Sequence, residues 1–130
     1  MRVGLLEDDT SIQEMLMLIL QDEGYTVSVY SDAQECLDAL GVAAQDGTSP
    51  PVDLMIIDWR LSGSLSGTEV IQQIRSNPRF ASLPIILTTA ATFNDTEALQ
   101  HLHIALLEKP FSVDEIIALI NDLAQPSPSS

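Results

Sequence analysis

Short apolar runs alternate with amphipathic stretches along almost the whole chain. The runs are rich in Val, Ile and Leu, and several are apolar at consecutive positions. This pattern is typical of strands that are covered on both faces, as in a parallel sheet. The five predicted strands are Val3–Leu6, Tyr25–Tyr30, Leu54–Ile57, Ile85–Thr88 and Ile104–Leu107.

After each run, apolar residues recur at the three- and four-residue spacing of a helix. Thr10 with Gln13 is a capping-box candidate for the first helix, and Gly24 fits its end. The other helices are predicted over residues 31–44, from Ser66 to before Pro78, over residues 95–101, and from Ser112 onward. The residues expected to face inward are Ile12, Met15, Leu16, Ile19 and Leu20 in the first helix, Cys36, Leu37 and Leu40 in the second, Val70, Ile71 and Ile74 in the third, and Val113, Ile116, Ile117, Ile120 and Leu123 in the fifth.

The alternation of strand and helix predicts the fold class and the domain organisation. Right-handed crossovers give an α/β fold, a (βα)5 doubly wound parallel sheet of five strands. In a chain of 130 residues, one domain is expected, over residues 1–124. Residues 125–130 are rich in Pro and Ser and are expected to form a disordered tail or the start of a linker.

Charge and composition narrow the classes of function. The formal net charge is -14, and the five basic residues form no run, so direct binding of nucleic acid is not expected. The start of the chain lacks the apolar core of a signal peptide, and no apolar stretch reaches the ~18 residues of a membrane span. A cytoplasmic protein is therefore expected. Cys36 is the only cysteine and is expected to serve packing.

Polar side chains follow four of the five predicted strands. Because the carboxyl ends of parallel strands share one edge of the sheet, we expect these side chains to converge on one pocket. They are Glu7, Asp8 and Asp9 after the first strand, Asp58 after the third, Thr88 and Thr89 after the fourth, and Lys109, the only lysine, after the fifth.

This set of side chains could hold a metal ion and, next to it, an anionic group. Several carboxylates in one pocket repel one another, and a divalent cation removes that conflict. Oxygen ligands without His or Cys favour Mg²⁺ or Mn²⁺ over zinc. The ammonium of Lys109 and a threonine hydroxyl are then left for another negative group, and a phosphoryl group fits.

Some polar and aromatic residues also have ordinary structural explanations. Asp9 would serve equally as the cap of the first helix, and Thr88 as a buried strand threonine. Trp59 fits a partly buried anchor better than a ligand contact. His101 and His103 have no Cys or third His nearby in the sequence, so they are expected at the surface or in packing.

Four short motifs at the predicted strand ends occur together, namely Glu7-Asp8, Asp58, Thr89-Ala90 and Lys109-Pro110-Phe111. In this combination and order, the chain resembles the receiver domain of two-component response regulators. Each motif alone is weak, but the set at these spacings is highly specific. The resemblance covers the chain from Arg2 to about Leu123. It implies a flavodoxin-like sheet with the strand order 2-1-3-4-5.

The resemblance implies a metal site and a phosphoacceptor. Asp58 would accept a phosphoryl group from the phosphohistidine of a partner kinase. Asp8 and Asp58 would bind Mg²⁺ directly, Glu7 would help through a water molecule, and the backbone carbonyl of Arg60 would also face the metal. Such a domain is not an enzyme beyond its own phosphotransfer and dephosphorylation.

The resemblance also implies roles for the residues around the phosphoryl group and for partners. Thr89 would hydrogen-bond the phosphoryl group, and Lys109 would pair with one of its oxygens, with a cis peptide bond before Pro110. A sensor histidine kinase or a histidine phosphotransfer protein would dock near Ile12 and Met15. A homodimer through the face of the fourth and fifth strands is a further expectation.

The chain departs from the family pattern in four places. Leu106 stands where the family usually has Tyr or Phe as a rotating switch side chain. Ser62 replaces the usual proline, and the distance from Asp58 to Gly67 is one residue longer than usual. Arg60 places a cation two residues after the expected acceptor.

Other classes of protein fit the sequence less well. A receiver-like interaction module that works without phosphorylation is favoured by Leu106 and disfavoured by the acidic set and Lys109. An aspartate-nucleophile phosphatase needs a second Asp two residues after the nucleophile, where this chain has Arg60. An FMN-binding flavodoxin needs a phosphate loop rich in Ser, Thr and Gly after the first strand, and none is present there.

Overall fold

The computed structural model of the protein describes residues 2–40, 52–59, 66–90, 104–109 and 111–124. The strands are β1 (Arg2–Leu6), β2 (Thr26–Tyr30), β3 (Leu54–Asp58), β4 (Ile85–Ala90) and β5 (Ala105–Lys109). The helices are α1 (Thr10–Asp22), α2 (Ala33–Leu40), α3 (Gly67–Arg75) and α5 (Val113–Ala124), with the short 3-10 helix η1 (Pro78–Phe80). All strand pairs are parallel, and the order β2-β1-β3-β4-β5 confirms the predicted topology.

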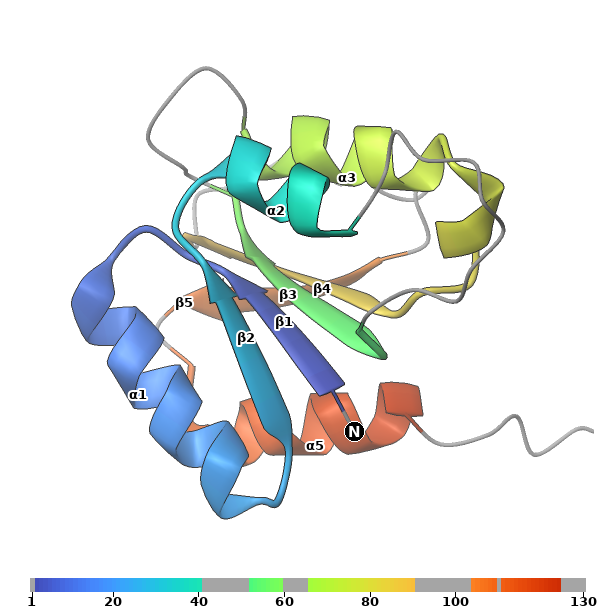
Figure 1. Ribbon diagram of the computed structural model, residues 1–130. Helices are drawn as coiled ribbons and strands as arrows, with labels where there is room; N and C mark the ends of the chain where they lie inside the picture. Colours follow the sequence, from blue (N-terminus) through green and yellow to red (C-terminus); the bar gives the residue numbers. More distant parts are fainter. Residues whose placement is uncertain (1, 41–51, 60–65, 91–103, 110, 125–130) are drawn as a thin grey trace, which may run out of the picture.

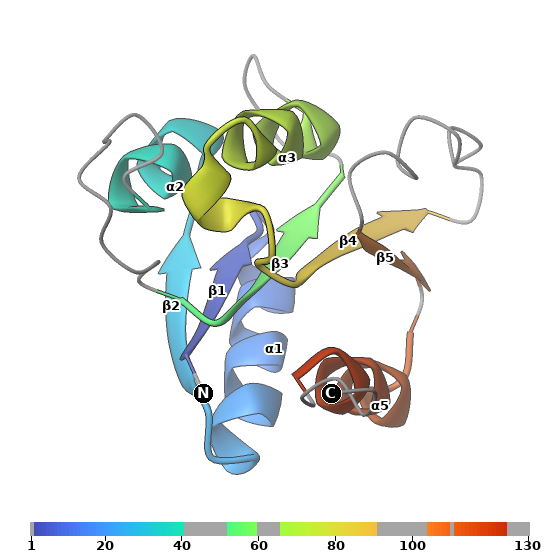
Figure 2. The same cartoon turned by 90° about the vertical axis from the view of Figure 1, so that its right-hand side faces the viewer.

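The sheet lies between two layers of helices, α1 and α5 on one face and α2 and α3 on the other (Figures 1 and 2). Side chains of a strand alternate between these faces. In β3, Leu54 and Ile56 pack on the side of α1 and α5, whereas Met55 and Ile57 pack on the side of α2 and α3. Asp58 continues the alternation, so the last residue of the central strand lies on the side of α1 and α5.

Three strands run further at their carboxyl ends than the apolar pattern predicts, and β3 does so by including Asp58. The strand predicted as Ile85–Thr88 continues to Ala90, and the last strand runs to Lys109 rather than ending at Leu107. The paired residues Thr89 and Glu108, and then Ala90 and Lys109, extend the ladder between β4 and β5. Backbone pairing does not depend on side-chain polarity, so the polar residues at the ends of these strands continue the ladder beyond the apolar runs.

The first helix begins differently from the prediction. The cap is Asp9, whose Oδ1 accepts hydrogen bonds from the backbone N–H groups of Ser11 at 2.9 Å and Ile12 at 3.2 Å. The predicted capping box of Thr10 with Gln13 is therefore wrong, and the alternative role of Asp9 is confirmed. Asp9 takes the position because its backbone is extended (φ -84°, ψ 114°), whereas Thr10 is already helical.

The other described helices begin and end near their predicted positions. Ser66 with Glu69, and Ser112 with Glu115, form reciprocal hydrogen bonds at the starts of α3 and α5. Gly24 adopts a φ of 89° just after α1, as expected for a helix stop. The predicted helix over residues 95–101, the end of the predicted helix over 31–44, and the tail 125–130 lie outside the described residues.

The helices bury most of the residues expected to face inward, including Leu16, Cys36 and Ile74. Two expectations are wrong, because Met15 is 43% exposed and Val113 is 50% exposed. Both side chains lie on outward-facing parts of their helices.

Candidate functional site

Three carboxylates meet at the carboxyl edge of the sheet. Glu7 and Asp8 follow β1, and Asp58 ends the neighbouring strand β3. One oxygen atom from each carboxylate lies within 4.8 Å of the others. Glu7 is 2% exposed and Asp58 5% exposed, whereas Asp8 is partly exposed. The structure therefore brings Glu7, Asp8 and Asp58 together, as the sequence predicts.

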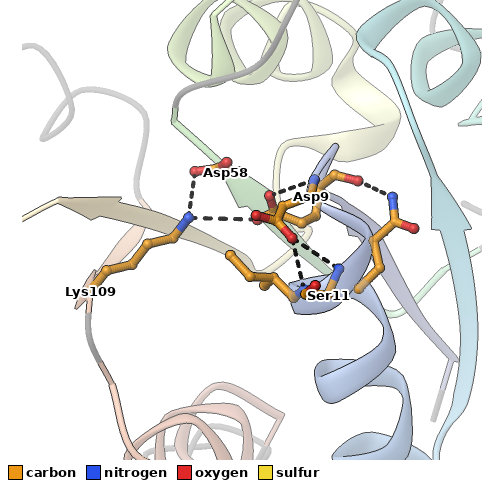
Figure 3. A network of polar contacts seen from close by, with 7 residues as sticks. Asp9, Ser11, Asp58 and Lys109 are labelled. Atoms are coloured by element: carbon orange, nitrogen blue, oxygen red, sulfur yellow. Dashed lines mark hydrogen bonds and ion pairs between the residues drawn. The ribbon is translucent and has the colours of Figure 1, made fainter.

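Lys109 reaches into the same cluster from the end of β5. Its Nζ donates a hydrogen bond to Asp58 Oδ1 at 3.1 Å and lies 3.7 Å from Glu7 Oε2 (Figure 3). The Lys109 side chain is 27% exposed, so its stem is partly covered while the ammonium contacts both buried acids. The only lysine of the chain thus contacts two of the three carboxylates.

The electrostatics of the cluster favour an additional cation. The pKa of Glu7 is raised from its ordinary value of 4.5 to about 7, mainly by burial and then by the charge of Asp58. The backbone N–H of Asp9 and the ammonium of Lys109 lower the pKa of Glu7, but their effects are smaller. Burial and the charge of Asp58 outweigh these two effects, so Glu7 holds a proton more strongly than an exposed glutamate does.

The donor set of the described residues fits a hard divalent ion. The three ligand atoms are carboxylate oxygens, which Mg²⁺ and Mn²⁺ prefer. A divalent ion would also offset the charge of Asp58, which after burial is the second cause of the raised pKa of Glu7. Arg60, whose backbone carbonyl was expected to face the metal, lies outside the described residues.

The loop after β1 is held by hydrogen bonds to its neighbours. The backbone N–H of Glu7 donates to the carbonyl of Tyr30 at 3.3 Å, and the N–H of Asp9 donates to Glu7 Oε1 at 3.2 Å. Gln13, in the first turn of α1, donates its side-chain amide to the backbone carbonyl of Glu7. The sequence predicted only a capping role for Gln13, and this contact was not predicted.

The two threonines after Ile86 and Leu87 are both buried, at 2% exposure. Thr88 pairs with Asp58 in the ladder between β3 and β4. Thr89 lies one residue further along β4 and pairs with Glu108 of β5. Thr89 therefore lies at the carboxyl edge of the sheet, like Asp58, and its side chain is buried.

The start of α3 packs directly against the backbone of the acidic site. The N–H of Gly67 donates to the carbonyl of Trp59 at 2.9 Å. A Cβ atom at Gly67 would lie 2.4 Å from the backbone oxygen of Asp58 and 2.8 Å from the Cα of Trp59. Only glycine fits this approach, a role that the sequence reading missed. The signal was a glycine in the first turn of a helix, where alanine is the better helix former.

The remaining residues of interest have simple positions. Trp59 is partly buried against the core on the side of α2 and α3, as expected for an anchor. Leu106 is 37% exposed and pairs with Leu87. Ser62, His101, His103 and Pro110 lie outside the described residues. Among the described helices, none is long and apolar enough to cross a membrane.

Comparison with known proteins gives relatives of one kind. Residues 3–121 match the family described as "Response regulator receiver domain". Response regulator RppA of Synechocystis is 33% identical over 130 residues, which cover 98% of this chain and 52% of RppA. The DNA-binding transcriptional regulator NtrC of Escherichia coli is 32% identical over 120 residues, which cover 91% of this chain and 24% of NtrC. The chain thus spans about half the length of RppA and about a quarter of NtrC.

Solved structures agree with the sequence comparison. The chemotaxis protein CheY4 of Vibrio cholerae superposes with a TM-score of 0.80 at 23% identity, covering 94% of this chain and 97% of CheY4. The receiver domain of the sensor histidine kinase PA1611 from Pseudomonas aeruginosa superposes with a TM-score of 0.78 at 25% identity, covering 95% and 96%. That protein has a magnesium ion coordinated in its active site cleft. The chain with its acidic cluster at the sheet edge belongs to the response regulator receiver domains of two-component systems.

Proposed function

We propose that Asp58 accepts a phosphoryl group from a sensor histidine kinase or a histidine phosphotransfer protein. Mg²⁺ or Mn²⁺ would assist, and the domain, over residues 1–124, would then change conformation to control an output domain or partner. The observation that carries the proposal is the position of Asp58. Its carboxylate lies in the acidic cluster and accepts a hydrogen bond from Lys109 at 3.1 Å.

The chemistry needs a nucleophile and neutralisation of charge. A carboxylate oxygen of Asp58 attacks the phosphorus of phosphohistidine, so an O–P bond forms and the P–N bond breaks. The histidine nitrogen leaves with the electron pair of the broken bond. A carboxylate has no proton to lose, so no general base is required. A bound metal ion would supply charge neutralisation, and Glu7, Asp8, Asp58 and the backbone carbonyl of Arg60 would hold it.

Lys109 and Thr89 would respond to the new charge. Phosphorylation replaces the single negative charge of the Asp58 carboxylate with the larger negative charge of the phosphoryl oxygens, about −1.5 to −2. The Lys109 ammonium, which contacts Asp58 before transfer, would pair with one of these oxygens. The Thr89 hydroxyl would donate to another. Because Thr89 is buried in β4 next to β5, its movement would repack that part of the sheet.

The partner would approach the start of α1, next to the acidic cluster. Met15 is 43% exposed there, and Ile12 is partly buried one turn earlier. These side chains support the proposed docking of a kinase or phosphotransfer protein near Ile12 and Met15. A homodimer through the face of β4 and β5 is a separate part of the proposal, supported by the 37% exposure of Leu106.

The test is phosphorylation by acetyl phosphate in the presence of Mg²⁺, followed by mass spectrometry. We expect one added phosphoryl group on the parent protein, none on Asp58→Asn, and normal phosphorylation of Asp38→Asn, which changes an exposed carboxylate on α2. Hydroxylamine should remove the group, because an acyl phosphate is labile to it. If neither acetyl phosphate nor the cognate kinase phosphorylates the parent, the proposal is wrong.

A second candidate function is protein interaction without phosphorylation. Leu106 in β5 favours it, because an aliphatic, partly exposed side chain stands where an aromatic switch residue is expected. In this case Asp58→Asn would bind the output partner with the same affinity as the phosphorylated parent. A phosphorylation-dependent affinity would exclude this candidate.

A further inference from the structure

Gln13 lies in the first turn of α1, and its side chain points back to the end of β1. Its Nε2 donates a hydrogen bond to the backbone carbonyl of Glu7, in a partly buried position. The ladders of β1 end at Leu6, which pairs with Tyr30 on one side and Ile57 on the other. The carbonyl of Glu7 therefore lies beyond the paired residues of β1, and within the described part of the chain Gln13 donates to it.

Further hydrogen bonds connect the loop after β1 to the start of α1. Asp9 donates its N–H to Glu7 Oε1 at 3.2 Å and caps α1 through Ser11 and Ile12 (Figure 3). The backbone N–H of Gln13 donates to the carbonyl of Asp9 at 2.9 Å. Gln13 thus bonds to this loop twice, through its backbone at Asp9 and through its side chain at Glu7.

The peptide bond from Glu7 to Asp8 links two of the three carboxylates of the cluster. If the Glu7 carbonyl turns, the Asp8 backbone turns with it, because the peptide unit is planar. An amide donor aimed at the Glu7 carbonyl therefore fixes the orientation of the peptide unit that joins Glu7 to Asp8.

We propose that Gln13 is a positioning residue for the divalent-ion site, acting through the Glu7–Asp8 peptide. The inference rests on the proposed function, since it needs an ion bound by this cluster. Mg²⁺ demands near-octahedral ligands at about 2.1 Å, whereas Ca²⁺ accepts flexible geometry. Loss of a residue that orients metal ligands typically weakens metal affinity by about 10- to 100-fold. Loss of Gln13 should therefore weaken Mg²⁺ binding more than Ca²⁺ binding.

The test is a titration of Mg²⁺ and of Ca²⁺, followed by the fluorescence of Trp59, the only tryptophan, which directly follows Asp58. Gln13→Met keeps the length of the side chain but removes the donor. We expect its Kd for Mg²⁺ to rise about tenfold or more, and its Kd for Ca²⁺ to change much less. Gln34→Met is the matched control, because Gln34 also donates through Nε2, to Asp38 on α2 at 2.9 Å, away from the cluster. Its affinities should equal those of the parent.

A second variant and a second measurement separate positioning from folding. Gln13→Asn keeps an amide but is too short to reach the carbonyl, so it should show the same selective loss of Mg²⁺ affinity. In the metal-free protein, the ¹⁵N resonance of Asp8 should move in both variants, because this amide shares its peptide unit with the Glu7 carbonyl. Circular dichroism checks that both variants are folded.

The outcomes distinguish the inference from the proposed function. Equal Mg²⁺ affinity in the parent and the Gln13 variants, or an equal loss for Mg²⁺ and Ca²⁺, overturns the inference alone. A parent protein that shows no response to Mg²⁺ and is not phosphorylated overturns the proposed function, and the inference with it.

Discussion

Glu7→Gln should stabilise the metal-free protein at alkaline pH, although it removes a charge from the proposed metal site. Glu7 is 2% exposed, and its pKa is raised from 4.5 to about 7 by burial and by the charge of Asp58. The folded protein therefore binds the proton of Glu7 more tightly than the unfolded chain does. Stability contributed by this group is present below pH 4.5 and is lost as the pH rises to about 7.

The size of the effect follows from the two pKa values. Each pKa unit corresponds to about 1.4 kcal/mol, so ionising Glu7 in the folded protein costs up to about 3 kcal/mol more than in the unfolded chain. Glutamine has no such cost and can still accept the hydrogen bond from Asp9. The loss of the 3.7 Å ion pair with Lys109 reduces the gain. We expect Glu7→Gln to be more stable than the parent at pH 8, by at most about 3 kcal/mol, and equally stable near pH 4.5.

The measurement is the free energy of unfolding in urea between pH 4.5 and 8, in EDTA and then in excess Mg²⁺. Glu14→Gln is the matched control, because Glu14 is an exposed glutamate on α1, and its pH profile should follow that of the parent. Added Mg²⁺ should stabilise the parent at pH 8 more than Glu7→Gln, because the ion relieves the repulsion that the variant lacks. The reasoning is refuted if, without metal, the difference between Glu7→Gln and the parent stays the same from pH 4.5 to 8.

Three further substitutions test other parts of the structure. Gly67→Ala should destabilise the protein by about 1–3 kcal/mol in urea unfolding and slow its phosphorylation, because the new Cβ would lie 2.4 Å from the Asp58 backbone oxygen; unchanged stability would mean that α3 is not packed as described. Lys109→Ala should retain Mg²⁺ binding and phosphorylation but lose the change in amide hydrogen exchange of β4 and β5 on phosphorylation, and a normal exchange response would show that its role is wrongly assigned. Ser112→Ala should cost about 1 kcal/mol, because Ser112 Oγ accepts the N–H of Glu115 at 3.1 Å; no loss in thermal or urea unfolding would argue against this cap.

The topology and the acidic cluster could be predicted because strong, local signals mark them. Asp58 directly follows four consecutive buried apolar residues, and such a run in an alternating pattern of strands and helices defines a central parallel strand. Glu7 directly follows β1 and Lys109 ends β5. Parallel strands bring their carboxyl ends to one edge of the sheet, whatever the conformation of the connecting loops.

The misjudged features depend on contacts or angles that side-chain types do not encode. Asp9 and Thr10 are both good capping residues, and the choice between them depends on where β1 ends and the backbone turns. Met15 lies on a helix whose apolar residues exceed the width of the face that α1 buries, so spacing alone could not place it outside. The close approach of Gly67 to Asp58 joins segments whose distance appears only in the folded chain.

The position of Lys109 beside Asp58 makes its amine a reporter of the site. The side chains of this chain contain one primary amine, and that group is partly accessible, at 27% exposure, while it contacts two acids of the cluster. A reagent that acylates lysine would therefore modify a single side chain, and the mass of one peptide would record the reaction. A phosphoryl group on Asp58 should slow that acylation by holding the ammonium, so the rate of labelling would measure occupancy of the site without any substitution in the protein.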